Sequence, residues 1–257
     1  MITIKSEREI ELMRQVGKLA AKCLQDMGKL VQEGNTPKQL DEACREWTER
    51  HNAIPATMNY KGYPANLCVS VNDVVCHGIP DSRPFRNGDI VNLDVTPILN
   101  GYHGDTNATF FVGEVPENVK EFVATANESM WAGIRQVRPG NTLGDIGHAI
   151  ESLVKARGYS VVIEYCGHGI GRNFHEDPVV MHVGRPKQGV ILKPGMTFTI
   201  EPMINMGSAK TKLEGDGWTV RTVDGSLSAQ FEHTVLVTPT GVEVLTLPEG
   251  EIPPFPL

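Results

Sequence analysis

The sequence predicts an α+β protein made of two related halves, in which helices pack on the outer face of an antiparallel sheet. Gly34-Asn-Thr36 recurs as Gly140-Asn-Thr142, and in both places a long helix pattern precedes the triplet and another follows it. Further along, Gly88-Asp-Ile-Val-Asn-Leu-Asp94 is matched by Gly195-Met-Thr-Phe-Thr-Ile-Glu201, so each copy has an acid six residues after a glycine. We therefore expect a pseudo-twofold axis that brings acids from both halves to the centre.

A third match follows the same order but at a shorter spacing. His77-Gly-Ile79 resembles His168-Gly-Ile170, which requires extra residues in the second half, and the loop-like stretch 181–190 can supply them. The connection at 114–118 is too short for a free linker. We therefore predict one domain over residues 1–257, with internal halves of about 1–115 and 116–257.

The helix starts carry specific signals. Ser6 and Glu9 form a capping-box pattern before a run of apolar residues at helical spacing. Thr36 precedes Pro37, which is favoured in the first turn of a helix, and Thr142 stands at the equivalent place in the second half. These patterns predict two helices in each half.

Composition narrows the class of protein. The net charge is −7 without a basic cluster, which argues against a nucleic-acid partner. No apolar run is long enough to span a membrane, and residues 1–22 lack the apolar core of a signal peptide. The five cysteines are scattered and form no C-x-x-C pair, which is typical of reduced thiols. We expect a cytoplasmic protein.

Acidic side chains stand inside strand-like, apolar runs. Asp94, Asp105, Glu201 and Glu232 each lie in or next to a stretch rich in β-branched and aromatic residues. A buried acid is costly unless a positive charge compensates it, and these runs contain no lysine or arginine. Bound metal is the simplest explanation, and four carboxylates exceed the needs of one ion. His168, in a glycine-rich segment, is the imidazole that we expect beside them.

Two of the acids flank a hairpin. Asn100-Gly101 is the preferred sequence for a two-residue type I′ turn. With these residues as the loop, Thr96 opposes Asp105 and Asp94 opposes Asn107. Asp94 and Asp105 are then diagonal neighbours on one face, roughly 7–8 Å apart at the backbone. Two such carboxylates can hold metal ions that lie roughly 3.5–4 Å apart.

As an ordered set, the motifs resemble those of the type I methionine aminopeptidases of the pita-bread metallopeptidase family, in their short bacterial form. The resemblance spans nearly the whole chain and rests on Val74-Val-Cys-His77-Gly-Ile-Pro80, Gly88–Val95, Gly101-Tyr-His-Gly-Asp105-Thr106, Tyr165-Cys-Gly-His168-Gly-Ile-Gly171, Phe174-His175-Glu176, Leu192–Pro202, Asp216-Gly-Trp218-Thr219 and Leu227–Thr234. It implies the pita-bread fold and the removal of N-terminal methionine from nascent proteins and peptides, with a preference for a small second residue.

The resemblance also implies roles for individual residues. Two divalent ions (Co, Mn, Fe or Zn) would be held by Asp94, Asp105, His168, Glu201 and Glu232, with Asp105 and Glu232 bridging. His77 and His175 would hold the substrate and polarise its carbonyl group, and Glu201 would transfer a proton. The methionine side chain would contact Tyr60, Tyr63, Cys68, Phe174 and Trp218. A monovalent cation (Na or K) would lie near the backbone of Asn72, Val74 and Ser228.

Further expectations come from the same resemblance. It implies a monomer that acts on nascent polypeptide N-termini, with transient ribosome contact and no membrane attachment. Thr57 stands where many relatives have a cysteine, which puts the fine shape of the pocket in doubt. We expect the histidines that have been given no role, His51, His103, His148, His182 and His233, to be structural.

Two alternatives stay open on the sequence. One is an Xaa-Pro dipeptidase or creatinase-like hydrolase, which has the same fold and metals but usually carries an additional N-terminal domain. The other is a binding protein on the same scaffold that has lost catalysis. Relatives of that kind usually lose metal ligands, whereas this chain has all five.

Overall fold

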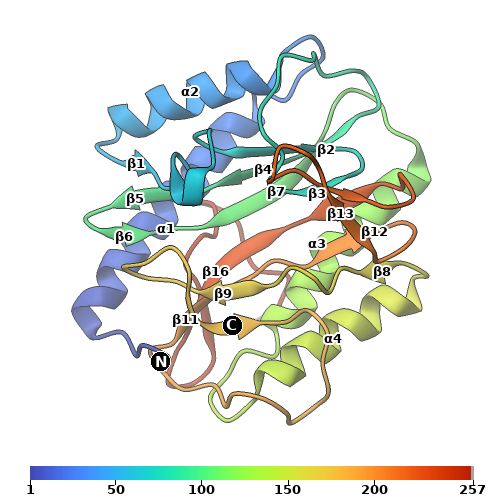
Figure 1. Cartoon of the computed structure of the whole chain (residues 1–257). Helices are drawn as coiled ribbons and strands as arrows, with labels where there is room; N and C mark the ends of the chain where they lie inside the picture. Colours follow the sequence, from blue (N-terminus) through green and yellow to red (C-terminus); the bar gives the residue numbers. More distant parts are fainter. Residues whose placement is uncertain (256–257) are drawn as a thin grey trace.

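The computed structural model describes residues 1–255, which contain four α-helices packed on a large antiparallel sheet (Figure 1). The helices are α1 (Glu7–Gly28), α2 (Pro37–Arg50), α3 (Glu117–Ile134) and α4 (Leu143–Ala156). At the starts of α1, α2 and α4, a side chain in the first turn accepts a hydrogen bond from the backbone N–H of Ser6, Thr36 or Thr142. These three predicted helix starts are confirmed.

The large sheet has the symmetry that the repeated motifs predict. Its strand order is β10-β9-β11-β16-β7-β4-β2, and β17 pairs with β16. The central pair β16–β7 is flanked by β11 on one side and β4 on the other, so the two halves mirror each other across the centre. The strands are β2 (Cys68–Val71), β4 (Ile90–Val95), β7 (Thr106–Phe111), β9 (Gly167–Gly169), β10 (Glu176–Val180), β11 (Thr197–Ile200), β16 (Glu232–Val237) and β17 (Val242–Val244).

Three small sheets surround the large one. The first joins β1 (Ile54–Pro55), β5 (Pro97–Leu99) and β6 (Tyr102–His103). The second joins β8 (Ser160–Val161), β12 (Met203–Asn205) and β15 (Ser228–Gln230). The third joins β3 (Val74–Cys76), β13 (Thr211–Leu213) and β14 (Val220–Thr222), and a short 3₁₀ helix, η1, covers Tyr60–Gly62.

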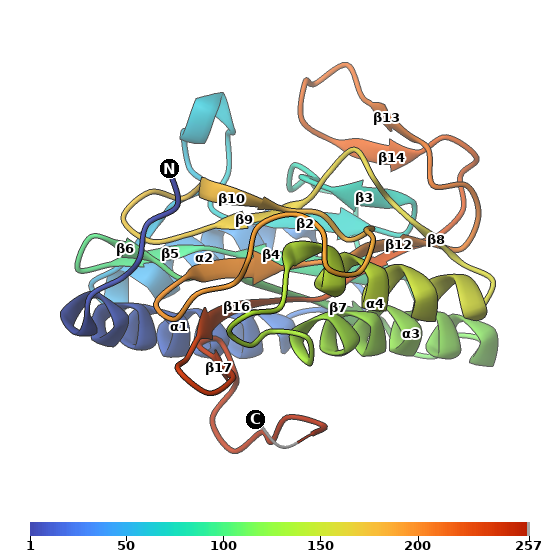
Figure 2. The ribbon, with the colours of Figure 1, turned by 90° about the horizontal axis from the view of Figure 1, so that it is seen from below.

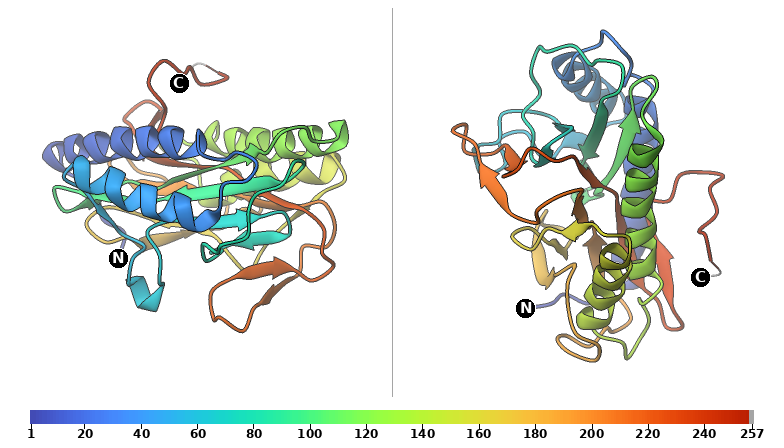
Figure 3. Two further views of the ribbon diagram at one scale, coloured as in Figure 1. Left: turned by 90° about the horizontal axis from the view of Figure 1, so that it is seen from above. Right: turned by 90° about the vertical axis from the view of Figure 1, so that its right-hand side faces the viewer.

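The helices cover one face of the large sheet, as predicted. Figures 2 and 3 show them in a layer on one side, while η1 and the β13–β14 hairpin project from the other side. In the first half, α1 and α2 pack on β2 and β4 around Leu40 and Leu93; in the second, α3 and α4 pack on β11 around Ile146 and Phe198. The opposite face of the sheet is therefore free to carry a site between the projecting segments.

None of the helices in residues 1–255 is long and apolar enough to cross a membrane. The cysteines Cys23, Cys44, Cys68, Cys76 and Cys166 are free thiols, as the sequence predicts. The division into halves at about residue 115 stays a prediction, although it falls between the end of β7 and the start of α3.

One of the three sequence matches is wrong as evidence for the duplication. His168 lies in β9, which pairs with β11, and the strand in the corresponding place of the first half is β2, which pairs with β4. His77 instead follows β3, which belongs to another sheet, and has a left-handed backbone with φ of 56°. The second half gains the edge strand β10 in addition to the loop expected at 181–190.

Candidate metal centre and substrate pocket

The predicted hairpin places Asp94 and Asp105 as expected. Asp94 pairs with Asn107 across β4 and β7, and the Thr96 hydroxyl donates a 2.8 Å hydrogen bond to Asp105 Oδ1. Asn100 and Gly101 both have positive φ, 53° and 79°, as a type I′ turn requires. The local turn chemistry thus sets the register that brings the first two acids onto one face of the sheet.

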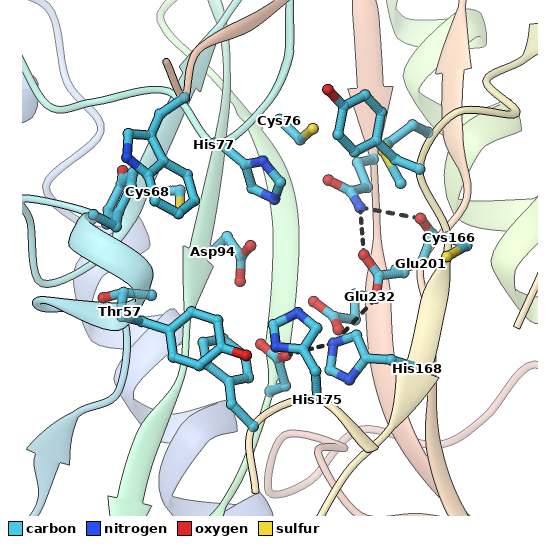
Figure 4. Close-up of a pocket in the computed structure, with 18 of the residues that line it drawn as sticks. Thr57, Cys68, Cys76, His77, Asp94, Cys166, His168, His175, Glu201 and Glu232 are labelled. Carbon is cyan, nitrogen blue, oxygen red and sulfur yellow. Dashed lines mark hydrogen bonds and ion pairs between the residues drawn. The ribbon is translucent and has the colours of Figure 1, made fainter. Parts of the chain in front are cut away.

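The second half brings three more ligating side chains to the same place. Glu201 follows β11, Glu232 begins β16 and His168 lies in β9, and these strands are neighbours in the sheet. One donor atom each from Asp105, His168 and Glu232 lies within 4.8 Å of the others. His168 Nε2 is 3.4 Å from Asp105 Oδ2 and 3.7 Å from Glu201 Oε1. Figure 4 shows Asp94, Glu201, Glu232 and His168 around one central space.

Hydrogen bonds from neutral side chains orient these acids. The Asn107 amide donates to Glu232 Oε2 at 2.7 Å, and the Thr199 hydroxyl donates to Glu201 Oε1 at 2.7 Å. His168 has Nδ1 3.0 Å from the Gly169 carbonyl oxygen, which leaves Nε2 directed toward the acids. The arrangement matches a ligand set whose outer contacts fix each donor group.

The acids are electrostatically costly as they stand. Burial, followed by the nearby Asp105 carboxylate, raises the pKa of Asp94 and of Glu232 well above the ordinary value. Burial also raises the pKa of Glu201 to about 7. Asp94 Oδ1 and Glu232 Oε1 are buried and have no hydrogen-bond partner among residues 1–255. Unpaired buried oxygens of this kind fit a metal site, because hard divalent cations prefer carboxylate and imidazole ligands.

A cavity of about 290 Å³ opens directly beside the acids. The structure brings together all of the predicted substrate-contacting residues in its wall, namely Tyr60, Tyr63, Cys68, His77, Phe174, His175 and Trp218. Tyr63 and Trp218 meet edge to face at 5.2 Å between ring centroids, and the Tyr63 hydroxyl donates to the Gly78 carbonyl oxygen at 2.8 Å. This part of the wall is a fixed apolar recess.

The two histidines proposed to contact substrate lie at the border between the recess and the acids. His175 stacks on Tyr60 at 5.2 Å between ring centroids, and its ring is tilted by 33° against that of His168, 4.0 Å away. His77 meets Tyr165 and Trp218 edge to face, at 5.7 and 6.1 Å. Burial lowers the pKa of both rings, that of His175 to about 3. Both imidazoles are therefore neutral near pH 7, so each has one N–H that can donate a hydrogen bond.

Several cavity residues have no role in the sequence analysis. They are Lys61, Cys76, Glu164, Tyr165, Cys166, Met203 and Gln230, together with Thr57, which the sequence analysis raised only as a departure from the pattern. Most lie within a few residues of a predicted ligand or histidine, which was the available signal. Gln230 Nε2 donates to Glu201 Oε2 at 3.2 Å, so this residue acts directly on a candidate ligand.

Comparisons with known proteins agree with this geometry. The model of metallopeptidase family M24 matches residues 11–239. Methionine aminopeptidase A of Synechocystis is 50% identical over 249 residues, with 96% of this chain and 98% of the relative aligned. Methionine aminopeptidase of Escherichia coli K12 is 48% identical over 256 residues, which cover 98% of this chain and 97% of the relative.

Solved structures give the same result. The crystal structure of methionine aminopeptidase from Rickettsia prowazekii matches with a TM-score of 0.95 and 50% identity, over 96% of this chain and all (100%) of that one. Prolidase from Pyrococcus furiosus matches with a TM-score of 0.79 at 22% identity, over 96% of this chain and 66% of that one, which shows the shared pita-bread fold alone. The chain belongs to metallopeptidase family M24 and, within it, to the methionine aminopeptidases.

Proposed function

We propose that this chain removes the N-terminal methionine from proteins and peptides in a reaction that depends on two divalent metal ions. One observation carries the proposal: two buried carboxylate oxygens without partners, Asp94 Oδ1 and Glu232 Oε1, line the same cavity as an aromatic recess. Buried carboxylate oxygens without partners are stabilised by bound cations, and the recess suits an apolar side chain. The high identity to methionine aminopeptidases supports the same activity.

In this proposal the metal ions would be held by Asp94, Asp105, His168, Glu201 and Glu232. The donor set of carboxylates and one imidazole suits Co, Mn, Fe or Zn in the divalent state. When bound, a pair of such ions supplies an acidified water and polarises a carbonyl group.

The chain's own residues bind the substrate and move protons. His77 and His175 are neutral and border the acids, so their N–H groups can hold the carbonyl oxygen at the scissile bond. Glu201 is our candidate for carrying a proton to the leaving amine, because its carboxylate lines the same cavity as His77 and His175.

The recess selects the first residue. The recess is apolar and has a thiol in its wall, which suits an unbranched thioether. It is lined by Tyr60, Tyr63, Cys68, Phe174 and Trp218. Because His77 and His175 border the space between the recess and the acids, we expect only a small second residue to fit there. Thr57, whose hydroxyl is buried without a partner among residues 1–255, lines the same cavity.

Several finer features belong to the same proposal. We infer a monovalent cation, Na or K, near Asn72, Val74 and Ser228, where the Ser228 N–H donates to the Asn72 carbonyl oxygen at 2.9 Å. We also infer a cytoplasmic monomer that acts on nascent chains, with transient contact to ribosomes.

The test is digestion of Met-Ala-Ser, Met-Leu-Ser and Ala-Pro by the purified protein with Co²⁺, Mn²⁺, Fe²⁺ or Zn²⁺ added, read by mass spectrometry. We expect release of methionine from Met-Ala-Ser, much slower release from Met-Leu-Ser and no cleavage of Ala-Pro. Cleavage of Ala-Pro alone would instead favour the dipeptidase alternative. An inactive protein without bound metal would favour the non-catalytic alternative.

A further inference from the structure

The backbone of Glu201 is held by side chains and not by the sheet. The ladder between β11 and β16 ends at the pair Ile200–His233, and Pro202, which follows Glu201, has no N–H. The Glu201 N–H donates to His182 Nε2 at 3.1 Å, and the Glu201 carbonyl oxygen accepts from Gln230 Nε2 at 3.0 Å. Two side chains from distant parts of the chain thus provide the hydrogen-bond partners of the backbone N–H and carbonyl oxygen of Glu201, a candidate ligand.

His182 is the less expected of the two. Its side chain is buried, with the residue only 1% exposed, and it lies in the loop that follows β10. Because Nε2 accepts a hydrogen bond, the proton of the neutral ring is on Nδ1, and Nδ1 is buried without a partner among residues 1–255. An unpaired buried N–H is energetically costly. The bond to Glu201 is the one polar contact of the ring that the described residues provide.

Helix α4 sets the position of the loop that carries His182. A Cβ on Gly147 would overlap the carbonyl oxygen of Val183, so glycine is needed for the close approach of helix and loop. The Asp145 carboxylate accepts from the Lys187 N–H at 2.9 Å. The loop is therefore held to α4 at two points, Val183 and Lys187, and His182 extends from it to Glu201.

We propose that His182 and Gln230 are positioning residues that together hold Glu201 at the metal centre. Gln230 contacts both the carbonyl oxygen of Glu201 and its carboxylate oxygen Oε2, whereas His182 contacts only the backbone N–H. The inference rests on the proposed function, which makes Glu201 a metal ligand and a proton carrier. Loss of either contact frees the Glu201 carboxylate to move relative to Asp105 and His168, while the methionine recess is unchanged.

Three substitutions at His182 separate positioning from simple packing. His182→Leu removes the acceptor but keeps a similar volume. In His182→Asn the side-chain amide extends only as far as Nδ1 of the histidine. In His182→Gln the amide oxygen can lie near the position of Nε2. We expect His182→Leu and His182→Asn to bind Mn²⁺ about 10- to 100-fold more weakly by titration calorimetry, the usual effect of losing an outer contact to a ligand. His182→Gln should recover most of the affinity. In the peptidase assay, kcat for Met-Ala-Ser should fall in parallel while KM changes little.

His148→Ala is the matched control, because His148 is an exposed residue on α4. It should bind Mn²⁺ like the unaltered protein. The inference is overturned if His182→Leu binds Mn²⁺ with unchanged affinity, or if His182→Gln loses as much affinity as His182→Leu. Should His182→Leu fail to fold, Gln230→Met serves in its place: it has a similar volume but neither a donor nor a charge, and unchanged Mn²⁺ affinity would equally overturn the inference.

These outcomes are distinct from a failure of the proposed function. An unaltered protein that binds Mn²⁺ but cleaves no Met-Ala-Ser contradicts the proposed activity, and the Mn²⁺ affinities of the variants still decide the role of His182. Conversely, a fully active protein whose His182 variants bind Mn²⁺ normally refutes only the positioning role.

Discussion

Replacing Glu201 by glutamine is expected to raise the free energy of unfolding of the metal-free protein and to lower that of the metal-bound protein. The Glu201 side chain is 14% exposed, and burial raises its pKa from an ordinary value of 4.5 to about 7. A difference of this size corresponds to about 3 kcal/mol of free energy between the two protonation states. The ionised carboxylate therefore works against folding when no cation is present.

The direction of the pH dependence follows from proton binding. Between pH 4.5 and about 7 the folded protein keeps a proton on Glu201 that the unfolded chain has lost. The free energy of unfolding therefore falls as pH rises through this window and levels off above it. Glutamine carries no charge and removes this loss. The pKa of Glu201 already includes the hydrogen bond from Thr199, so the gain of Glu201→Gln at pH 8 is about 3 kcal/mol.

Urea unfolding with a chelator present, at pH 5 and pH 8, measures this gain. Glu201→Gln should match the unaltered protein near pH 5 and exceed it at pH 8, whereas Glu164→Gln, at an exposed residue of the same cavity, should change little at either pH. With saturating Mn²⁺ the order should reverse, because a ligand that binds only the folded state adds stability that rises with the logarithm of its affinity. If the metal-free variant is no more stable than the unaltered protein at pH 8, the electrostatic reasoning is wrong.

Four further predictions follow from the site and its supports. Asp94→Asn should abolish metal binding and peptidase activity and leave the circular dichroism spectrum unchanged. Full activity of the unaltered protein with one metal equivalent or fewer would contradict the paired-ion mechanism. His175→Ala should reduce kcat strongly and spare Mn²⁺ binding in calorimetry; near-normal turnover would remove its role. Lys5→Met should lower the free energy of unfolding, measured in urea, by about 3–5 kcal/mol. The reason is that Glu176, whose side chain is 10% exposed, loses the ammonium group that lies 2.7 Å away. Adding Glu176→Gln should recover most of that loss. Thr57→Val should stabilise the protein by about 1 kcal/mol, since the hydroxyl is buried without a partner among residues 1–255, and a loss of stability would show that the hydroxyl is hydrogen-bonded in solution.

The features that the sequence predicted well are those with local signals. Asn100-Gly101 determines both the turn type and the pairing of Asp94 with Asn107, because a two-residue loop leaves only one register. The capping residues Ser6, Thr36 and Thr142 identify helix starts for the same reason, since the contacts they make lie within one turn of helix. Such predictions need no knowledge of the tertiary structure.

The missed features depend on contacts between distant segments. Nothing near His182 in the sequence indicates that its ring accepts a hydrogen bond from Glu201, since the contact requires β10 to add to the sheet and the following loop to pack on α4. The incorrect match of His77 with His168 has a related cause. Short glycine-containing triplets recur by chance, and only the strand pairing shows that β2 is the counterpart of β9.

Strand pairing also reveals how the two halves differ at the centre. Asp94 and Glu201 stand at the corresponding ends of β4 and β11, as the repeated motifs predict. Asn107 pairs with Asp94 across β4 and β7, and the extension of the β11–β16 register places Glu232 opposite Glu201 in the same way. Asn107 and Glu232 are therefore counterparts, and they pair with each other where β7 meets β16.

By the same residue count, Asp105 in the first half corresponds to Gln230 in the second. Each half thus contributes two acids and one amide to three related positions, but the amide stands at a different position in each. Asn107 donates to Glu232 Oε2 and Gln230 donates to Glu201 Oε2, so each amide supports an acid of the second half. Acids at all six positions would raise the cost of burial. Amides at two of the six positions lower the buried charge and supply the donors that orient the acids of the second half.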